Sequence, residues 1–164
     1  MQELKVKKVI IGKQFENCKN YEEFNNIVKE KKIKVQVVEA GQRINIEKDL
    51  YFDVLWPSSD HVIYENSINN HSLVGKLVYD NFSVLFTGDI EEIAEKAILE
   101  RYKNKKDRLN STVLKVAHHG SKSSSTKDFI DLVSPKIALI GVGEKNTFGH
   151  PNSQVLERLK RRKM

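Results

Sequence analysis

Apolar and polar residues alternate in short runs along the first third of the chain. Ile33, Val35 and Val37 alternate with polar residues, which is typical of a strand that is buried on one face. Apolar residues at helical spacing over residues 21–31 predict a helix. Strands are predicted at residues 6–11, at residues 33–37 and, as a pair, at residues 43–56. The first third is therefore expected to be rich in strand.

Strands and helices alternate over the second half of the chain. Apolar residues recur at the 3.6-residue helical period from Ile90 to Tyr102, which predicts a helix that starts within a residue of Asp89. Asp80 and Asn81 separate two apolar runs and predict a hairpin, because both residue types tolerate positive φ. The other elements are strands at residues 72–79, 82–86, 112–117 and 136–142, the last of them buried, a helix through residues 129–133 capped by the serine-rich turn 123–126, and a helix from Ser153, its N-cap, to about residue 163. This order favours an α/β layered arrangement.

Composition excludes several classes of protein. The chain has 164 residues and a mass of 18.9 kDa, the size of one ordinary domain. With 39% hydrophobic and 30% charged residues it can build a core, which excludes collagen-like, low-complexity and wholly disordered chains. Lysine and arginine outnumber aspartate and glutamate by 28 to 22, for a formal charge of +6. This charge favours anionic partners such as nucleic acid or lipid headgroups, and is equally consistent with a lysine-rich solvated surface.

Cysteine content and the length of the apolar runs narrow the picture further. Cys18 is the only cysteine, so an internal disulfide framework and a multi-cysteine zinc site are both excluded. No apolar run approaches the ~20 residues needed to span a bilayer. Residues 1–12 lack the hydrophobic region and the small-residue cleavage site of a signal peptide. We therefore expect neither a transmembrane segment nor a signal peptide, and the compartment stays open.

Residues that can bind a metal ion follow three successive predicted strands. These residues are Asp89, the pair His118 and His119, and His150. In open α/β sheets ligands gather beyond the carboxyl ends of the strands, so we expect these side chains to converge. Carboxylate and imidazole together suit Zn²⁺, Mn²⁺ or iron, and such a site can lower the pKa of bound water to ~7. Each residue alone has a structural alternative: Asp89 could cap the following helix, and residues 149–151 could form only a turn.

Other serine and histidine residues have weaker patterns. Ser121 and the serines at 123–125 could donate hydrogen bonds to a phosphate, or could only cap the following helix. His61 and His71 lie in the polar segment 58–71, which predicts a loop, and we expect both to be solvent-exposed loop histidines. Nothing near the serines resembles an oriented Ser–His–Asp arrangement, so a serine nucleophile is not expected.

Three stretches of the sequence carry recognisable motifs. They read NNHSLVGKLVYDNFSVLFTGDIEEIAEKAIL, VLKVAHHGSKSSS and SPKIALIGVGEKNTFGHPNSQVLERL, with TGD, HHGS and GHP in that order. Over roughly residues 50–159 the chain resembles the metallo-β-lactamase-fold domain of the competence protein ComEC family. The resemblance implies an αββα sandwich, in which a mixed sheet is flanked by helices and the metal site lies at one edge between two sheets. It also implies a role in DNA uptake, in which this domain is proposed to act as a nuclease on the non-transported strand.

The resemblance implies a role for each motif residue. Asp89 in TGD matches the aspartate that bridges two metal ions, and His150 in GHP matches the last histidine ligand. His118 and His119 match the HHGS pair, of which one binds the metal or a substrate phosphate. A further histidine ligand of the superfamily is replaced in ComEC-type proteins by an asparagine–serine stretch, here residues 69–72, which makes His71 a substitute candidate. We assign catalysis to Asp89, His118 and His119, metal binding to Asp89, His118 and His150, and substrate binding to Ser121, His119 and Asn70.

One signature of the superfamily is missing from the sequence. HxHxDH, its main metal-binding motif, does not occur, and the first predicted strand resembles the segment that shortly follows this motif. Residues 1–164 therefore resemble the C-terminal portion of a metallo-β-lactamase domain, without its early strands, three or four of its metal ligands and the membrane channel region of ComEC. One face of the sheet is then expected to form an exposed apolar patch, which pairs with the missing N-terminal half or forms a homodimer.

Two functions follow from this resemblance. In the first, the chain is part of a metal-dependent hydrolase, a phosphodiesterase or nuclease acting on single-stranded DNA. The complete domain would hold two Zn²⁺ or Mn²⁺ ions, and this chain would be inactive or impaired. In the second, the chain is a non-catalytic remnant or a nucleic-acid-binding module that uses its basic surface, including residues 160–163. Metal content and DNA cleavage distinguish the two functions.

Overall fold

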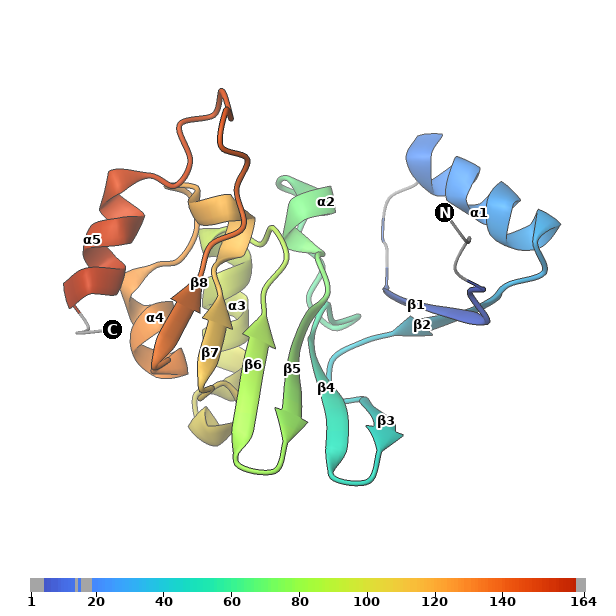
Figure 1. Cartoon of the computed structure of the whole chain (residues 1–164), viewed down its shortest axis with the longest axis horizontal. Coiled ribbons are helices and arrows are strands. Elements are labelled where there is room, and N and C mark those ends of the chain that lie inside the picture. The colour runs from blue at the N-terminus through green and yellow to red at the C-terminus, as the bar shows by residue number, and fades with distance from the viewer. Residues whose placement is uncertain (1–4, 14, 16–18, 162–164) are drawn as a thin grey trace.

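A mixed six-stranded sheet with helices on one of its faces forms the main body of the structure (Figure 1). The computed structural model describes residues 5–13, 15 and 19–161, so Cys18 and residues 162–163 of the basic tail lie outside the described residues. The elements in chain order are β1 (Lys8–Gly12), α1 (Lys19–Glu30), β2 (Lys34–Val38), β3 (Arg43–Glu47), β4 (Leu50–Trp56), α2 (Ser67–Asn70), β5 (Val74–Tyr79), β6 (Phe82–Phe86), α3 (Glu92–Tyr102), the 3₁₀ helix η1 (Lys106–Arg108), β7 (Val113–Lys115), the 3₁₀ helix η2 (Ala117–Gly120), α4 (Lys127–Val133), β8 (Ile137–Leu139) and α5 (Ser153–Arg161). No helix in this described part is long and apolar enough to cross a membrane.

The six strands lie in the sheet in their chain order, from β3 to β8. β3 to β6 pair antiparallel, whereas β6, β7 and β8 run parallel. The turn between β5 and β6 has a φ of 49° at Asp80, as the predicted hairpin requires. β1 and β2 form a separate parallel pair, which lies with α1 to one side of the sheet (Figure 1). The predicted α/β class, with a mixed sheet flanked by helices, is confirmed.

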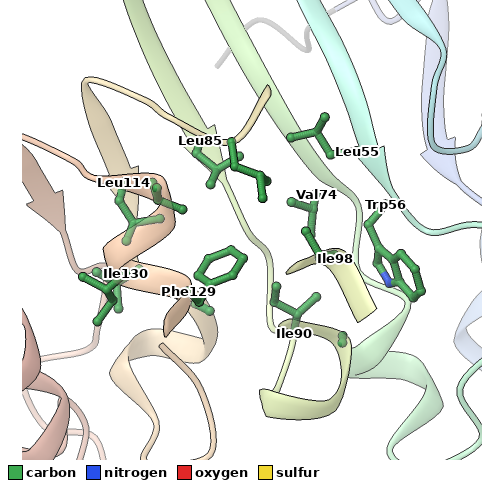
Figure 2. Packing of buried hydrophobic residues seen from close by; sticks show 14 of the residues in the cluster. Leu55, Trp56, Val74, Leu85, Ile90, Ile98, Leu114, Phe129 and Ile130 are labelled. Atoms are coloured by element: carbon green, nitrogen blue, oxygen red, sulfur yellow. The ribbon is translucent and has the colours of Figure 1, made fainter. Parts of the chain in front are cut away.

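The hydrophobic core lies between the sheet and the helices α3, α4 and α5. Leu85 on β6 and Leu114 on β7 pack with Ile98 of α3 and Phe129 of α4 (Figure 2). Trp56 at the end of β4 is fully buried in the same cluster and donates its Nε1–H to the carbonyl oxygen of Asn70 at 2.6 Å. Each such side chain contributes roughly 1.5–3 kcal/mol by its burial. The apolar stripe that predicts α3 is therefore the face that this helix turns to the sheet.

The prediction of a buried strand at residues 136–142 is wrong. Only Ile137–Leu139 of this segment form a strand, β8, which lies at one edge of the sheet, and Ile137 and Leu139 are 51% and 53% exposed. Both side chains point to the face opposite the helices, which the described part of the chain leaves open. An apolar composition predicts burial only where another layer covers the strand.

Two predicted helix caps also differ from the structure. Thr126, which lies in the predicted turn, is the N-cap residue of α4, but its side chain makes no capping hydrogen bond. Ser153 is the first residue of α5 rather than its cap, and the side-chain oxygen of Asn152 accepts the N–H of Gln154 at the start of the helix. In both places several residues of the cap-forming types occur side by side, so the sequence alone does not identify the residue whose side chain bonds to the helix N–H groups.

The face of the sheet opposite the helices carries a continuous set of exposed apolar side chains. We call this set the open sheet face; its members are Tyr79, Phe82, Phe86, Ile137 and Leu139, which are 40–59% exposed. In the strand register Tyr79 lies opposite Phe82, and Phe86 lies opposite Lys115, which lies opposite Leu139. Phe82 and Phe86 are four residues apart on β6, so all of these side chains share one face of the sheet. At roughly 100 Å² for each half-exposed large side chain, the open sheet face presents about 500 Å² of apolar surface. That is near the upper end for a monomer.

We expect the purified chain to self-associate through the open sheet face. Two copies of about 500 Å² bury roughly 1,000 Å² together, which meets the lower limit for a specific interface. The double variant Ile137→Lys and Leu139→Lys should raise the dimer dissociation constant at least about tenfold, because it puts charges into an apolar interface. Sedimentation velocity over a range of concentrations measures this. Ile27→Lys on α1, at an apolar residue of similar exposure, is the control. A wild-type chain that stays monomeric at all concentrations would contradict the expectation.

Glu95 on α3 is a buried carboxylate that holds the loop before α4. Its oxygens accept the backbone N–H groups of Ser125 and Thr126, at 2.5 and 2.8 Å, and the Thr126 hydroxyl at 2.7 Å. Burial raises the pKa of Glu95, against the lowering effect of the hydrogen bonds from Thr126 and Ser125. A glutamate whose pKa is higher in the folded state favours folding when it is protonated, so its contribution is lost as pH rises.

This pKa shift predicts a pH-dependent difference between the wild type and Glu95→Gln. The contribution of Glu95 is complete below the unfolded-state pKa, ordinarily 4.5, and is lost as pH rises through the higher folded-state pKa. Glutamine does not titrate, so the free energy of unfolding of the wild type, relative to that of Glu95→Gln, should fall as pH rises above 4.5. Urea titrations at several pH values measure this difference. A difference that grows with pH would mean that the carboxylate is stabilised in its charged form.

Candidate functional site

The predicted metal-binding residues lie at one edge of the sheet. Asp89 follows β6, His118 and His119 follow β7, and His150 lies in the loop that follows β8. Because these three strands are parallel, their carboxyl ends share the same edge. The loops after β7 and β8 and the short helix α2 gather at this end of the molecule (Figure 1). The structure therefore brings the three motif loops together, as the strand-end positions predict.

The three motif loops are joined by their backbones. The N–H of His118 donates to the carbonyl oxygen of Gly88 at 3.0 Å, which links HHGS to TGD. The N–H of Asn152 donates to the carbonyl oxygen of Gly120 at 2.9 Å, which links GHP to HHGS. A Cβ atom on Gly120 would lie 2.8 Å from Pro151 Cβ, so glycine is required where these two loops cross. The relative position of the loops is thus set by backbone contacts.

The loop that carries Asp89 is held by the segment before β5. Gly88 has a φ of +55°, and a Cβ on it would lie 2.5 Å from Ser72 Cβ. The hydroxyl oxygen of Ser72 accepts the N–H of Asp89 at 3.0 Å. Asp89 does not cap α3, because the helix begins at Glu92 and its N-cap residue is Glu91. The Asp89 side chain is 44% exposed and open to solvent.

His118 and His119 share an unusual backbone conformation. Their φ angles are +47° and +54°, both in the left-handed region. This region costs a non-glycine residue roughly 1–2 kcal/mol, so two in succession are strained. Backbone strain of this kind persists only where surrounding contacts enforce it, and it is concentrated at functional sites. Here the bond from His118 N–H to Gly88 and the bond from Ser121 N–H to the His118 carbonyl oxygen, at 2.8 Å, hold the turn.

The histidine side chains form two groups. His119 Nδ1 donates to the carbonyl oxygen of Gly141 at 2.6 Å, and its Nε2 lies 3.7 Å from an oxygen of Asp89. His118 Nδ1 lies 3.5 Å from Glu91 Oε1, and the rings of His118 and His150 are 6.0 Å apart. The Nδ1 atoms of His118 and His150 are buried and make no hydrogen bond. Two imidazole nitrogens without a hydrogen bond therefore lie in adjacent rings.

The donor types at this edge suit a divalent metal ion. Carboxylate oxygen and imidazole nitrogen are ligands of Zn²⁺ and Mn²⁺, and the buried Nδ1 of His150 makes no hydrogen bond inside the chain. Within the residues that the structure describes, no three His, Cys, Asp or Glu side chains are close enough together to hold a metal ion. Asp89, His118 and His150 thus fit a metal ion in chemistry, but of the three only His118 and His150 have neighbouring rings, and Asp89 lies beside His119 instead.

Both polar atoms of the Asn70 side chain make hydrogen bonds within the chain. Its side-chain oxygen accepts the N–H of Glu91 at 2.9 Å, and its side-chain nitrogen donates to the carbonyl oxygen of Glu65 at 2.8 Å. The residue is fully buried. Its place in the structure is therefore between α2 and the start of α3, where it holds the loop that carries Asp89.

The histidines of the polar segment have different surroundings. His61 is exposed, as predicted. The prediction that His71 is exposed is wrong: it is 1% exposed and stacks on Trp56. His71 Nδ1 donates to the carbonyl oxygen of Ser67 at 2.9 Å, and Nε2 accepts the N–H of Ile63 at 3.2 Å. Both ring nitrogens of His71 make hydrogen bonds within the chain, which argues against His71 as a substitute metal ligand.

The serine-rich turn lies beside the histidine pair. Ser121 is 7% exposed, and its hydroxyl lies 3.0 Å from that of Ser123. The hydroxyl of Ser124 donates to the carbonyl oxygen of Ile90 at 2.7 Å, so this serine ties the turn to α3. Ser121 is placed next to the site, with its hydroxyl bonded within the turn.

Glu91 is a site residue that the sequence reasoning missed. Its carboxylate lies next to His118, is 14% exposed, and accepts the side-chain N–H of Asn66 at 2.8 Å. In the sequence it is the first of two glutamates after TGDI and resembles an ordinary acidic residue in the first turn of a helix. The signal that could have found it is its spacing, two residues beyond Asp89 at the end of a strand.

Comparison with curated proteins finds relatives that are much longer than this chain. The chain is 35% identical over 157 residues to ComE operon protein 3 of Bacillus subtilis, which covers 96% of the chain and 19% of that protein. It is 38% identical over 114 residues to Recombination protein 2 of Haemophilus influenzae, covering 70% of the chain and 13% of that protein. It is 33% identical over 109 residues to Competence protein ComA of Neisseria gonorrhoeae, covering 66% of the chain and 15% of that protein. The chain thus spans less than a fifth of the length of each. No protein-family model matches the chain.

Proposed function

We propose that this chain supplies part of a metal-dependent phosphodiesterase site that acts on DNA in competence-related DNA uptake. Its homologues point to the competence ComEC/ComE family. The observation that carries the proposal is the gathering of Asp89, His118 and His150 at one sheet edge, with the buried Nδ1 of His150 left without a hydrogen-bond partner. Structural histidines satisfy their ring nitrogens inside the chain, as His71 does. A buried ring nitrogen without a partner, as in His150, is instead typical of a ligand-binding side chain.

The proposal includes a metallo-β-lactamase-type sandwich. A sheet with helices on one face and an apolar open face is one half of an αββα arrangement. The metal site of such a sandwich lies at the sheet edge, which is where the three motif loops meet. A second, N-terminal sheet and a membrane channel region would then be partners of this chain in a longer protein.

Each site residue has a proposed role. A bound Zn²⁺ or Mn²⁺ ion would polarise a phosphate oxygen and supply a nucleophilic water at neutral pH. Asp89, His118 and His150 would hold the metal, with further ligands from outside this set. His119 is held by its Nδ1–H on Gly141 and keeps Nε2 directed toward Asp89. As a neutral ring it would accept a proton at Nε2, and once protonated it would donate a hydrogen bond from Nε2 to a phosphate oxygen. Ser121 would hydrogen-bond the same phosphate at the start of the turn.

Metal titration and DNA cleavage test the proposal on the purified chain. Isothermal titration with MnCl₂ and ZnCl₂ should show saturable binding. Labelled single-stranded DNA incubated with the same metals should be cleaved slowly, because the chain supplies only part of the ligand set. A chain that binds neither metal and leaves single-stranded DNA intact would overturn the proposal for this chain.

A second candidate function is a non-catalytic module that binds nucleic acid through its basic surface. The formal charge of +6 and the lack of a three-ligand group among the described residues favour it. Binding through Lys and Arg releases counterions from DNA, so affinity should fall steeply as salt rises from 50 to 200 mM, without cleavage and without any metal. Fluorescence anisotropy with single-stranded DNA measures this. Binding that does not change with salt would exclude an electrostatic module.

A further inference from the structure

Glu91 joins the start of α3 to the histidine pair. It is the N-cap residue of α3, where a side chain ordinarily turns back to bind the helix N–H groups. Its side chain makes no such capping bond. The carboxylate is turned instead toward the loop of His118, with Oε1 3.5 Å from His118 Nδ1. The position of the side chain therefore is not explained by helix capping.

Contacts from two other loops hold this carboxylate in place. The side-chain N–H of Asn66, before α2, donates to Oε2 at 2.8 Å. The hydroxyl of Ser123, after the HHGS turn, donates to Oε1 at 3.3 Å. The backbone N–H of Glu91 is bound by Asn70. With only 14% of its side chain exposed, Glu91 has little freedom to turn away from His118.

We propose that Glu91 is the positioning residue of His118: its carboxylate accepts the Nδ1–H of that ring and leaves the Nε2 lone pair free to bind a cation. A carboxylate can only accept a hydrogen bond from a neutral ring if the facing nitrogen carries the proton. Carboxylates that bind the second nitrogen of a ligating histidine fix its tautomer and orientation. The two atoms are 3.5 Å apart, and the structure shows no hydrogen bond between them, so the proposed bond requires them to approach each other. The cation-binding half of this inference rests on the proposed function, whereas the tautomer half does not.

The tautomer of His118 can be observed directly on the metal-free chain. Long-range ¹H–¹⁵N spectra of the histidine rings, recorded in alkaline buffer where imidazole is neutral, show which nitrogen carries the proton. We expect His118 to carry it on Nδ1 in the wild type and to shift toward the Nε2–H form in Glu91→Ala. Glu91→Gln should preserve the wild-type tautomer, because its side-chain oxygen can still accept the hydrogen bond. Glu92→Gln is the matched control, since Glu92 is paired with Lys96 on the solvent side of α3.

Cation affinity gives the second measurement. Titration with Mn²⁺ alone should show a loss of about 10- to 100-fold in Glu91→Ala, the usual effect of removing such a carboxylate. Glu91→Gln should lose less, and Glu92→Gln should match the wild type. If Glu91→Ala fails to fold, Asn66→Gly releases the carboxylate while keeping a residue that suits the φ of +40° at this position.

The outcomes separate this inference from the proposed function. An Nδ1–H tautomer that shifts in Glu91→Ala, in a chain that binds no cation, would support the positioning role and contradict the metal-dependent function. A tautomer that does not change in folded Glu91→Ala, or an Nε2–H tautomer in the wild type, would overturn the positioning role whether or not a cation binds.

Discussion

Asp89→Ala and His150→Ala are each expected to weaken the binding of Mn²⁺ or Zn²⁺ by at least about 100-fold, because the loss of a direct ligand exceeds the 10- to 100-fold effect of losing a ligand's partner. Asp89 is the most accessible carboxylate at the site, with a 44% exposed side chain and a backbone held by Ser72. His150 contributes a buried nitrogen that has no other partner. Among the described residues, the side chains of Asp89 and His150 make no hydrogen bond within the chain, so both variants should fold.

His61→Ala is the matched control for these two variants. His61 is an exposed loop histidine whose ring meets only the edge of Trp56 among the aromatic rings described. Its removal should leave metal affinity unchanged. Isothermal titration of all three variants against the wild type, with circular dichroism to confirm folding, measures the difference. Equal losses in Asp89→Ala, His150→Ala and His61→Ala would refute the assignment of the site.

Gly88→Ala is expected to lower the free energy of unfolding by about 2–5 kcal/mol, the sum of the cost of a left-handed backbone and that of overpacking. The φ of +55° at Gly88 disfavours any side chain, and the added Cβ would lie 2.5 Å from Ser72 Cβ. Relief of this clash would move the loop that carries Asp89 away from Ser72. The variant should therefore also bind metal more weakly than the wild type.

Two further variants separate the backbone cost from the clash. Gly149→Ala shares a positive φ, +70°, but its Cβ would meet nothing within 4 Å, so it should cost only about 1–2 kcal/mol. Ser72→Gly removes the atoms that Gly88→Ala would strike. The double variant Ser72→Gly, Gly88→Ala should be more stable than the sum of the single effects predicts. Urea denaturation of the four variants measures this coupling, and additive effects would show that the close contact does not matter.

Local patterns predicted most of the helices and strands, because each pattern involves only residues that are close together in the sequence. The segment 33–37 forms β2 (Lys34–Val38), although Val35 and Val37 are exposed rather than buried, and the helical stripe after Asp89 forms α3 (Glu92–Tyr102). The hairpin at Asp80 was recognisable because the residue types at a tight turn limit its backbone. Helix caps were less predictable, since several residues in a row could act as the cap.

Burial was predicted less well than secondary structure. His71 lies in a segment of polar composition, yet it is buried because Trp56 and the backbone of Ile63 and Ser67 surround it. Ile137 and Leu139 are apolar and half exposed because no described layer covers that face. In both cases the outcome depends on residues that are distant in the sequence or on what packs over the element.

The sequence by itself determined the elements, their order and the three strand ends that carry Asp89, His118 with His119, and His150. Only the tertiary structure decided which of these side chains pair, that Glu91 faces His118, and which face of the sheet stays open. The physical reason is the range of the interactions. Hydrophobic period and turn preference act within a few residues along the chain, whereas side-chain pairing and burial depend on contacts between loops that the fold brings together.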